Sequence, residues 1–318
     1  MRKMLLFSII LSFIFSGTIF PSEIEETVKS TKSAGLKEGW SKGGTVTLNL
    51  NQVSLTNWAA GGEDTLSLSG LINVYANYKN GKNILENYLS INYGTIRQGD
   101  KNWSKSDDLL EISSKYGRNA GGNWYYAGLF DLKTQLANGF NPDDNSFSSR
   151  FFSPAYLLCA IGMDYNPNDN LTIFISPVSV RLTIVQMQEL ADKGAFGVEP
   201  ATYDLSGNLE SEGKISRTEL GGYFRLFYKR DLIKNISMQT KLELFSNYLA
   251  KPQNVDVYWD FLLSANINDY VSVNLSTNLI YDDDIIISND TNGDGIIDEN
   301  GPRLQFKEAL FIGFSYKF

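Results

Sequence analysis

Apolar and polar side chains alternate along most of the chain. Between positions 304 and 318, apolar residues occupy most even positions and polar or small residues most odd ones, with Glu308 and Phe311 as exceptions. Successive side chains of a strand point to opposite faces, so a period of two indicates β-strands with one apolar face. The same alternation recurs over 66–78, 238–248, 255–267 and 271–281.

The alternating segments are long for strands. A membrane-spanning strand needs roughly 9–11 residues, whereas a strand of a soluble protein commonly has about 5–6. The predicted fold class is therefore all-β: an antiparallel transmembrane β-barrel of about twelve strands in up-and-down order. The predicted strands lie near 44–55, 64–79, 84–97, 106–118, 122–137, 155–166, 169–182, 217–230, 235–248, 255–268, 269–282 and 303–318.

The connections between these strands alternate between short and long. Short ones fall at 80–82, 119–121, 166–170, 231–234 and 267–269, and longer ones at 56–63, 98–105, 138–154, 183–216, 249–254 and 283–302. Outer-membrane barrels have short periplasmic turns and longer external loops. The longest loop contains a segment, 185–193, that is typical of a short helix. The pattern leaves open whether this loop enters the lumen, covers the mouth or stays exposed.

A period of two does not say which face points inward. The polar face mixes charged residues with many Ser, Asn, Gly and Tyr residues, which favours a crowded wet interior and an apolar exterior. Inward charges would pair across the lumen, either as a plug or as a selectivity filter; the candidates are Asp131, Lys133, Arg225, Lys229, Lys241, Glu243, Asp256, Asp260 and Lys307. Aromatic residues that suit the girdles at the two membrane interfaces are Trp58, Trp103, Trp124, Tyr125, Tyr126, Tyr228, Tyr258 and Trp259.

The N-terminus has the features of an export signal. Arg2 and Lys3 precede an apolar stretch over 5–15, and small residues follow at 16–18. We therefore divide the chain into a signal peptide (1–20), an exposed leader (21–43) and the barrel (44–318). The expected location is the outer membrane, in contact with its lipids.

Composition excludes several classes of function. The net charge of -8 argues against a nucleic-acid partner, which requires a basic surface. The chain contains no histidine, which removes the usual Ser-His-Asp and Cys-His catalytic sites and histidine-ligated zinc. Its single cysteine, Cys159, cannot form an internal disulfide. We expect no enzymatic activity, and an outer-membrane hydrolase is the least favoured function.

One acidic segment resembles a calcium loop. Oxygen-bearing side chains occupy loop positions 1, 3, 5 and 9 (Asp290, Asn292, Asp294 and Asp298), and Gly295 allows the turn at position 6. The EF-hand glutamate of position 12 is replaced by Gly301, so this is no EF-hand. A weak calcium site and a solvated acidic turn both fit the pattern.

The C-terminus resembles the signal that the barrel-assembly machinery recognises. Gly313 is followed by aromatic residues three and five positions later, Tyr316 and Phe318. Phe311 departs from the pattern, which has a polar residue at that place. The resemblance implies that the last strand contacts the assembly machinery.

The chain also resembles an uncharacterised family of exported outer-membrane barrels, domain of unknown function 3078 (DUF3078). The similar residues are 57–63 (NWAAGGE), 281–284 (YDDD), 301–308 (GPRLQFKE) and 313–318 (GFSYKF). The resemblance implies the barrel and its place in the cell envelope, but no activity. Two functions therefore stay open: a narrow channel or transport-associated barrel, and a structural or surface-interaction barrel with a closed lumen and functional outer loops.

Overall fold

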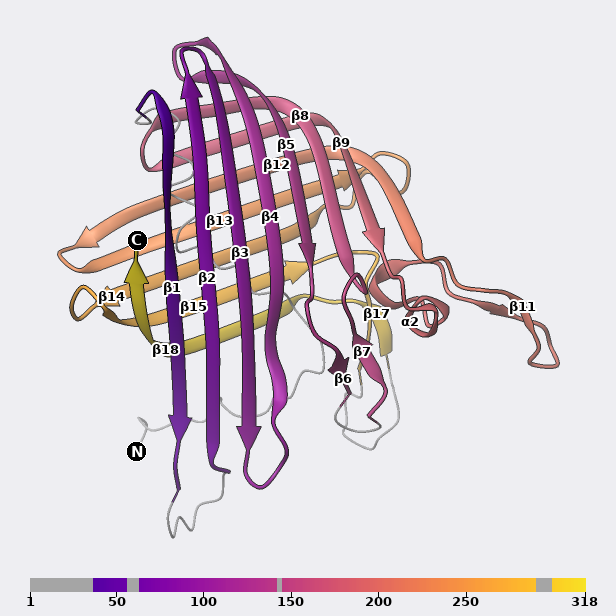
Figure 1. Ribbon diagram of the computed structural model, residues 1–318. Coiled ribbons are helices and arrows are strands. Elements are labelled where there is room, and N and C mark those ends of the chain that lie inside the picture. The colour runs from indigo at the N-terminus through magenta and orange to yellow at the C-terminus, as the bar shows by residue number, and fades with distance from the viewer. Residues whose placement is uncertain (1–36, 56–62, 142–144, 290–298) are drawn as a thin grey trace, which may run out of the picture.

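Twelve strands form a closed antiparallel barrel in up-and-down order (Figure 1). The structure, a computed structural model, describes residues 37–55, 63–141, 145–289 and 299–318. The barrel strands are β1 (Gly39–Val53), β2 (Thr65–Asn80), β3 (Asn83–Gln98), β4 (Ser104–Gly121), β5 (Trp124–Thr134), β8 (Ala155–Asn168), β9 (Leu171–Ile184), β12 (Ser216–Ile233), β13 (Ile236–Asn247), β14 (Asp256–Asn266), β15 (Val271–Tyr281) and β18 (Gln305–Lys317). Each of the predicted strands is present, and so the predicted fold class is confirmed.

The first strand starts earlier than its apolar pattern indicates. β1 begins at Gly39, within the segment predicted as a leader, because it pairs with β2 over its whole length. Trp40 lies opposite Tyr78 in the register, and the two rings pack against each other at a tilt of 43°, with centroids 5.1 Å apart. The predicted signal peptide, 1–20, lies outside the described residues.

Short turns join the strands at one end of the barrel and longer loops at the other. The longer loops carry β6 (Gly139–Phe140), β7 (Phe147–Ser149), α2 (Gln188–Asp192), η1 (Ala195–Gly197), β10 (Thr202–Tyr203), β11 (Leu209–Ser211), β16 (Ile286–Asn289) and β17 (Glu299–Pro302). The predicted alternation of connections is therefore confirmed. In the described part of the chain, no helix is long and apolar enough to cross a membrane.

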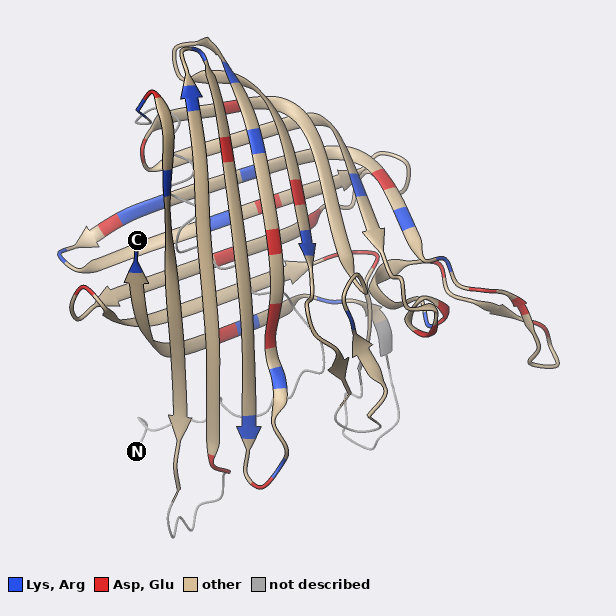
Figure 2. Ribbon diagram, in the orientation of Figure 1, with Lys and Arg blue, Asp and Glu red and all other residues tan. Residues whose placement is uncertain are grey.

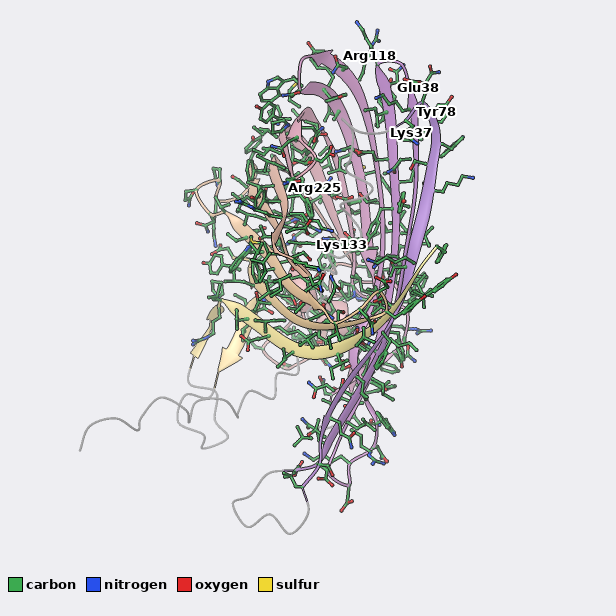
Figure 3. The ribbon with its side chains drawn as sticks, turned by 90° about the vertical axis from the view of Figure 1, so that its left-hand side faces the viewer. Lys37, Glu38, Tyr78, Arg118, Lys133 and Arg225 are labelled. Carbon is green, nitrogen blue, oxygen red and sulfur yellow. The ribbon has the colours of Figure 1, made fainter. Side chains whose placement is uncertain are left out.

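The barrel is flattened into two walls whose strands cross. Figure 1 shows β1 to β4 running steeply down the front of the view, whereas β13, β14, β15 and β18 run across it. Figure 3 shows side chains filling the space between these walls, with Lys133 and Arg225 among them. Strands that are far apart around the barrel can therefore touch through their inward side chains.

The apolar face of the strands points outward. Along β18, Phe306, Leu310 and Phe314 are each about half exposed, whereas Asn73, Asn274 and other polar side chains inside the barrel are buried. A soluble barrel has the opposite arrangement, because its apolar side chains must avoid water. An apolar exterior around a polar interior is the arrangement of a transmembrane barrel.

Most of the predicted girdle aromatics face outward, but two do not. Trp103, Trp124, Tyr126 and Trp259 are exposed on the outside. Tyr258 instead points into the lumen, where its hydroxyl donates a hydrogen bond to Asp282 at 2.7 Å. Tyr125 lies opposite the buried Asp164, on the inward face. The girdle prediction is wrong for these two residues, since alternation along their strands turns them inward. Trp58 lies outside the described residues.

Candidate functional site: the barrel lumen

Four charged side chains meet near the middle of the lumen. This central cluster consists of Glu111 on β4, Lys133 on β5, and Lys241 and Glu243 on β13. Lys133 Nζ lies 3.1 Å from Glu243 and 3.7 Å from Glu111, and Lys241 Nζ lies 3.3 Å from Glu243 and 3.6 Å from Glu111. Each ammonium group thus contacts both carboxylates, and the cluster has no net charge.

The central cluster spans the lumen from one wall to the other. Around the barrel, β8, β9 and β12 separate β5 from β13, so the contacts between Lys133 and Glu243 do not follow the sheet. A second cross-lumen pair, Arg225 on β12 with Asp131 on β5, lies beside it at 3.1 Å. The prediction that inward charges pair across the lumen is confirmed for these residues.

A turn-side cluster lies at the end of the lumen nearer the short turns. Lys115 on β4 contacts Glu86 on β3 at 2.9 Å and Asp164 on β8 at 2.8 Å. All three side chains are buried. Asn166 donates a further hydrogen bond to Asp164 at 2.8 Å. Figure 2 shows how several charged positions follow one another along β4.

A mouth cluster occupies the long-loop end. Arg181 on β9 donates two hydrogen bonds to Glu219 on β12, and its guanidinium lies 2.6 Å from the Asp256 carboxylate on β14. Arg217 bridges Glu219 at 3.1 Å and Asp284 at 3.0 Å. The guanidinium geometry suits two carboxylates at once, so these residues tie β9, β12 and β14 to the loop after β15.

Apolar side chains fill the space between the charged clusters. Ala127, Leu129, Ala160, Phe174, Tyr223 and Phe245 form one buried group contributed by five strands. Arg181 lies over the Phe245 ring at 4.2 Å, and the Tyr223 hydroxyl donates a hydrogen bond to Glu243. Apolar packing and ion pairs together obstruct this part of the lumen.

The lumen beside β1, β2 and β3 has a different chemistry. Its inward side chains include neutral amides and hydroxyls on all three strands. Several of their buried polar atoms have no hydrogen-bond partner among the described residues: Thr45 Oγ1, Asn49 Oδ1, Asn73 Nδ2, Ser90 Oγ and Asn92 Oδ1. Buried groups of this kind are normally satisfied by ordered water.

The longest loop stays at the mouth and does not enter the middle of the lumen. Its short helix, predicted over 185–193, is confirmed as α2, and α2 packs with η1 through Val185, Leu190, Ala191 and Val198. Asp192 accepts hydrogen bonds from the Gln188 side chain and the Gly213 backbone, which lower the pKa of its carboxyl. The β10–β11 hairpin projects away from the barrel (Figure 1).

Two further predicted luminal charges, Lys307 and Asp260, also have partners. Lys307 on β18 reaches Asp107 on β4 at 2.6 Å, across the mouth. Asp260 accepts a hydrogen bond from Asn278 of the neighbouring strand at 2.7 Å.

The four predicted calcium ligands (Asp290, Asn292, Asp294 and Asp298) lie outside the described residues. Within the described part of the chain, no group of three or more acidic or cysteine side chains is arranged to hold a metal ion.

Sequence reasoning missed several partners in these clusters. Glu86, Glu111, Lys115, Asp164, Arg181 and Glu219 all occupy inward positions of predicted strands. Alternation alone could have placed them in the lumen. It could not have paired them. Glu86 with Lys115 and Arg181 with Glu219 meet through the register of neighbouring strands joined by long loops, and the contact of Glu111 with Lys241 depends on the tilt of the two walls.

Comparison with known proteins supports the resemblance to the family. The family model "Protein of unknown function (DUF3078)" matches residues 50–140, from the end of β1 to the segment after β5. No curated protein matches the chain.

Among solved structures, the translocator domain of the autotransporter NalP from Neisseria meningitidis is 11% identical, with a TM-score of 0.37, and covers 91% of this chain and 93% of its own. An outer membrane channel from Pseudomonas putida F1 is 10% identical, with a TM-score of 0.41, and covers 89% and 97%. Similarities at this level identify neither an activity nor a ligand for this chain.

Proposed function

We propose that this chain is an outer-membrane β-barrel whose resting lumen is closed, and that it acts through its long-loop end. The central cluster carries the proposal, because its side chains join opposite walls and leave no uncompensated charge. The apolar exterior and the signal-like N-terminus support the location. Contact with outer-membrane lipid and with the barrel-assembly machinery through β18 belongs to the same proposal. We assign no catalytic role, since the chain has no histidine and no identifiable nucleophile with a base.

Single-channel recording in a planar lipid bilayer tests the closed lumen. The wild-type barrel should give no steady conductance. A variant with Glu111, Lys133, Lys241 and Glu243 all changed to alanine removes two charges of each sign, and it should produce conductance steps because the contacts between the walls are lost. The matched control is the Glu63→Ala, Lys101→Ala double variant. It removes an exposed pair 3.9 Å apart and should remain silent.

A narrow channel is the second candidate, favoured by the unpartnered polar atoms along β1, β2 and β3. A hydrated path there would avoid the charged clusters. Steady wild-type conductance that survives the fourfold alanine change, but falls when Asn73 is replaced by leucine, would overturn the closed-lumen proposal in favour of this path. The wild-type recording decides between the two functions even if the fourfold variant does not fold.

A further inference from the structure

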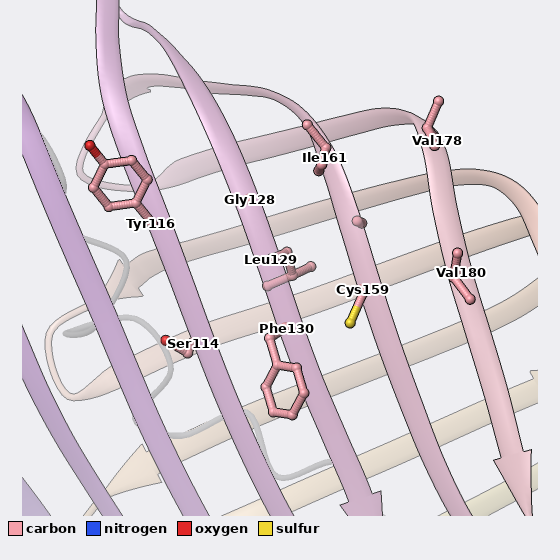
Figure 4. A pocket seen from close by; sticks show the side chains of 10 residues that line it. Ser114, Tyr116, Gly128, Leu129, Phe130, Cys159, Ile161, Val178 and Val180 are labelled. Carbon is pink, nitrogen blue, oxygen red and sulfur yellow. The ribbon is translucent and has the colours of Figure 1, made fainter.

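A hollow lies on the outer surface of the barrel, over β4, β5, β8 and β9 (Figure 4). Its volume is about 350 Å³, and its outward-facing lining is mainly apolar: Tyr116, Phe130, Cys159, Ile161, Val178 and Val180. The sheet itself separates it from the luminal clusters. The hollow is therefore independent of the site described above.

Gly128 creates the hollow. It faces outward on β5, with Tyr116 opposite it on β4 and Ile161 opposite it on β8. A Cβ atom added to Gly128 would have no heavy atom within 4 Å. The missing side chain thus leaves a gap between the apolar side chains that surround it. A larger residue could fill that gap without displacing a neighbour.

A cation stands at the turn-side end of the hollow. Arg118 lies two residues beyond Tyr116 on the same outward face of β4, which corresponds to roughly 7 Å along the strand. It is exposed, and no carboxylate of the described residues forms an ion pair with it. Figure 3 shows Arg118 at the end of the barrel that carries the short turns.

Aromatic side chains surround this cation. Tyr126 is paired with Arg118 in the register and is 62% exposed. On the same side, Trp124 packs against Tyr165 with the rings tilted and their centroids 4.6 Å apart. Tyrosine and tryptophan mark the level of lipid headgroups in membrane barrels. Arg118 therefore lies at headgroup depth and the hollow at acyl-chain depth.

We propose that the hollow and Arg118 together bind one phospholipid. An acyl chain lies against Gly128, and the phosphate pairs with the Arg118 guanidinium, whose fork of donors suits phosphate oxygens. The short turns of outer-membrane barrels face the periplasm, so the occupant comes from the inner leaflet. The assignment rests on the proposed membrane location and goes beyond it by naming a bound lipid.

Native mass spectrometry of the full-length barrel tests this site. The protein in detergent is mixed with dioleoyl phosphatidylglycerol or, separately, with dioleoylglycerol, which lacks the phosphate. The wild-type protein should retain one phosphatidylglycerol and little dioleoylglycerol. Gly128→Leu, which fills the hollow, should reduce retention at least tenfold. Arg118→Gln should reduce it about tenfold and abolish the preference for the phosphorylated lipid.

Two matched variants control for general effects on the surface. Gly70→Leu alters an outward glycine on β2 where an added Cβ meets only Leu48, at 3.8 Å. Arg97→Gln removes a cation that lies over Trp103 near the long-loop end. Both should retain lipid as the wild type does. A heat-dependent gel shift confirms that each variant has folded.

Equal retention by the wild type, Gly128→Leu and Arg118→Gln would overturn the site while leaving the barrel proposal intact. A wild-type dimer that Gly128→Leu converts to a monomer, with no lipid retained, would make the hollow an interface between copies and would also overturn it. A protein that is soluble without detergent would instead contradict the membrane location itself.

Discussion

At the scale of single residues, charged side chains in the lumen are buried and form ion pairs with side chains of opposite charge. Lys115 shows the principle: its ammonium group contacts two carboxylates, and the exposed fractions of the side chains are 5% for Lys115, 6% for Glu86 and 3% for Asp164. Removing charges from water is costly, and this cost is offset only while the partners remain together. Truncating one partner should therefore lower the free energy of unfolding by more than the whole cluster contributes to it, because the other charges stay buried without that partner.

Replacing Lys115 with alanine should lower the free energy of unfolding by about 3–5 kcal/mol, the usual cost of leaving a buried charge unpaired. Urea unfolding of the barrel in lipid or detergent measures the change. The control is Lys101→Ala at the exposed pair with Glu63, where about 0–1 kcal/mol is expected. Equal, small effects of the two substitutions would show that the turn-side cluster is solvated.

At the scale of elements, the barrel is closed by its shortest pairing. β1 and β18 share six register pairs, from Thr45 with Lys317 to Leu50 with Ile312, whereas β1 and β2 share fifteen. The seam ends in two backbone hydrogen bonds of 3.0 Å between Gly44 and Phe318. A Cβ atom on Gly44 would lie 2.6 Å from the Phe318 ring, so a glycine is required where the C-terminal ring packs.

A designed disulfide tests the register of this seam. Thr47 and Ser315 lie opposite one another, and their hydroxyl oxygens are 2.9 Å apart on the inward face. Opposite residues of an antiparallel pair approach disulfide distance. With Cys159 replaced by serine, the Thr47→Cys, Ser315→Cys variant should cross-link on oxidation. A non-reducing gel after full denaturation would show the altered mobility.

The neighbouring position provides the control for the seam. Leu48 points outward, so Leu48→Cys combined with Ser315→Cys places the two thiols on opposite faces of the sheet. This pair should cross-link poorly. Efficient cross-linking of the control together with failure of the Thr47 pair would mean that the register is shifted by one residue.

At the scale of the whole molecule, two crossing walls enclose a filled interior and present an apolar exterior. The closed barrel has no free strand edge, because each of its twelve strands pairs on both sides. Separating any two strands of a closed barrel therefore requires much free energy. The apolar outer surface of the barrel needs lipid or detergent. We therefore expect the folded barrel to be compact and to stay in solution only with lipid or detergent.

Gel mobility with and without boiling measures both properties. In mild detergent, the unboiled protein should be β-rich by circular dichroism and migrate as a compact species, and boiling should convert it to the unfolded mobility. A soluble protein of matched size serves as the control for the gel. Full solubility without detergent and a single mobility would contradict the outward apolar face.

Local patterns in the sequence determined much of this architecture. Alternation located the twelve strands and separated their two faces, and turn residues located the connections, because both signals depend only on neighbouring residues. The early start of β1 escaped the pattern, since Trp40 is held by Tyr78 of the next strand. The inward orientation of the Tyr125 and Tyr258 side chains was missed because aromatic residues suit both the girdle and a filled lumen.

The composition of the polar face favoured an apolar exterior, but only the tertiary structure showed that the apolar face points outward and which residues meet. A period of two is the same for a soluble core and for a lipid-facing surface, so the alternation by itself did not give the direction. The contact of Lys133 with Glu243, 110 positions apart, depends on how strongly the two walls tilt, which no local pattern encodes. The hollow at Gly128 likewise arises only when β4, β5, β8 and β9 lie side by side.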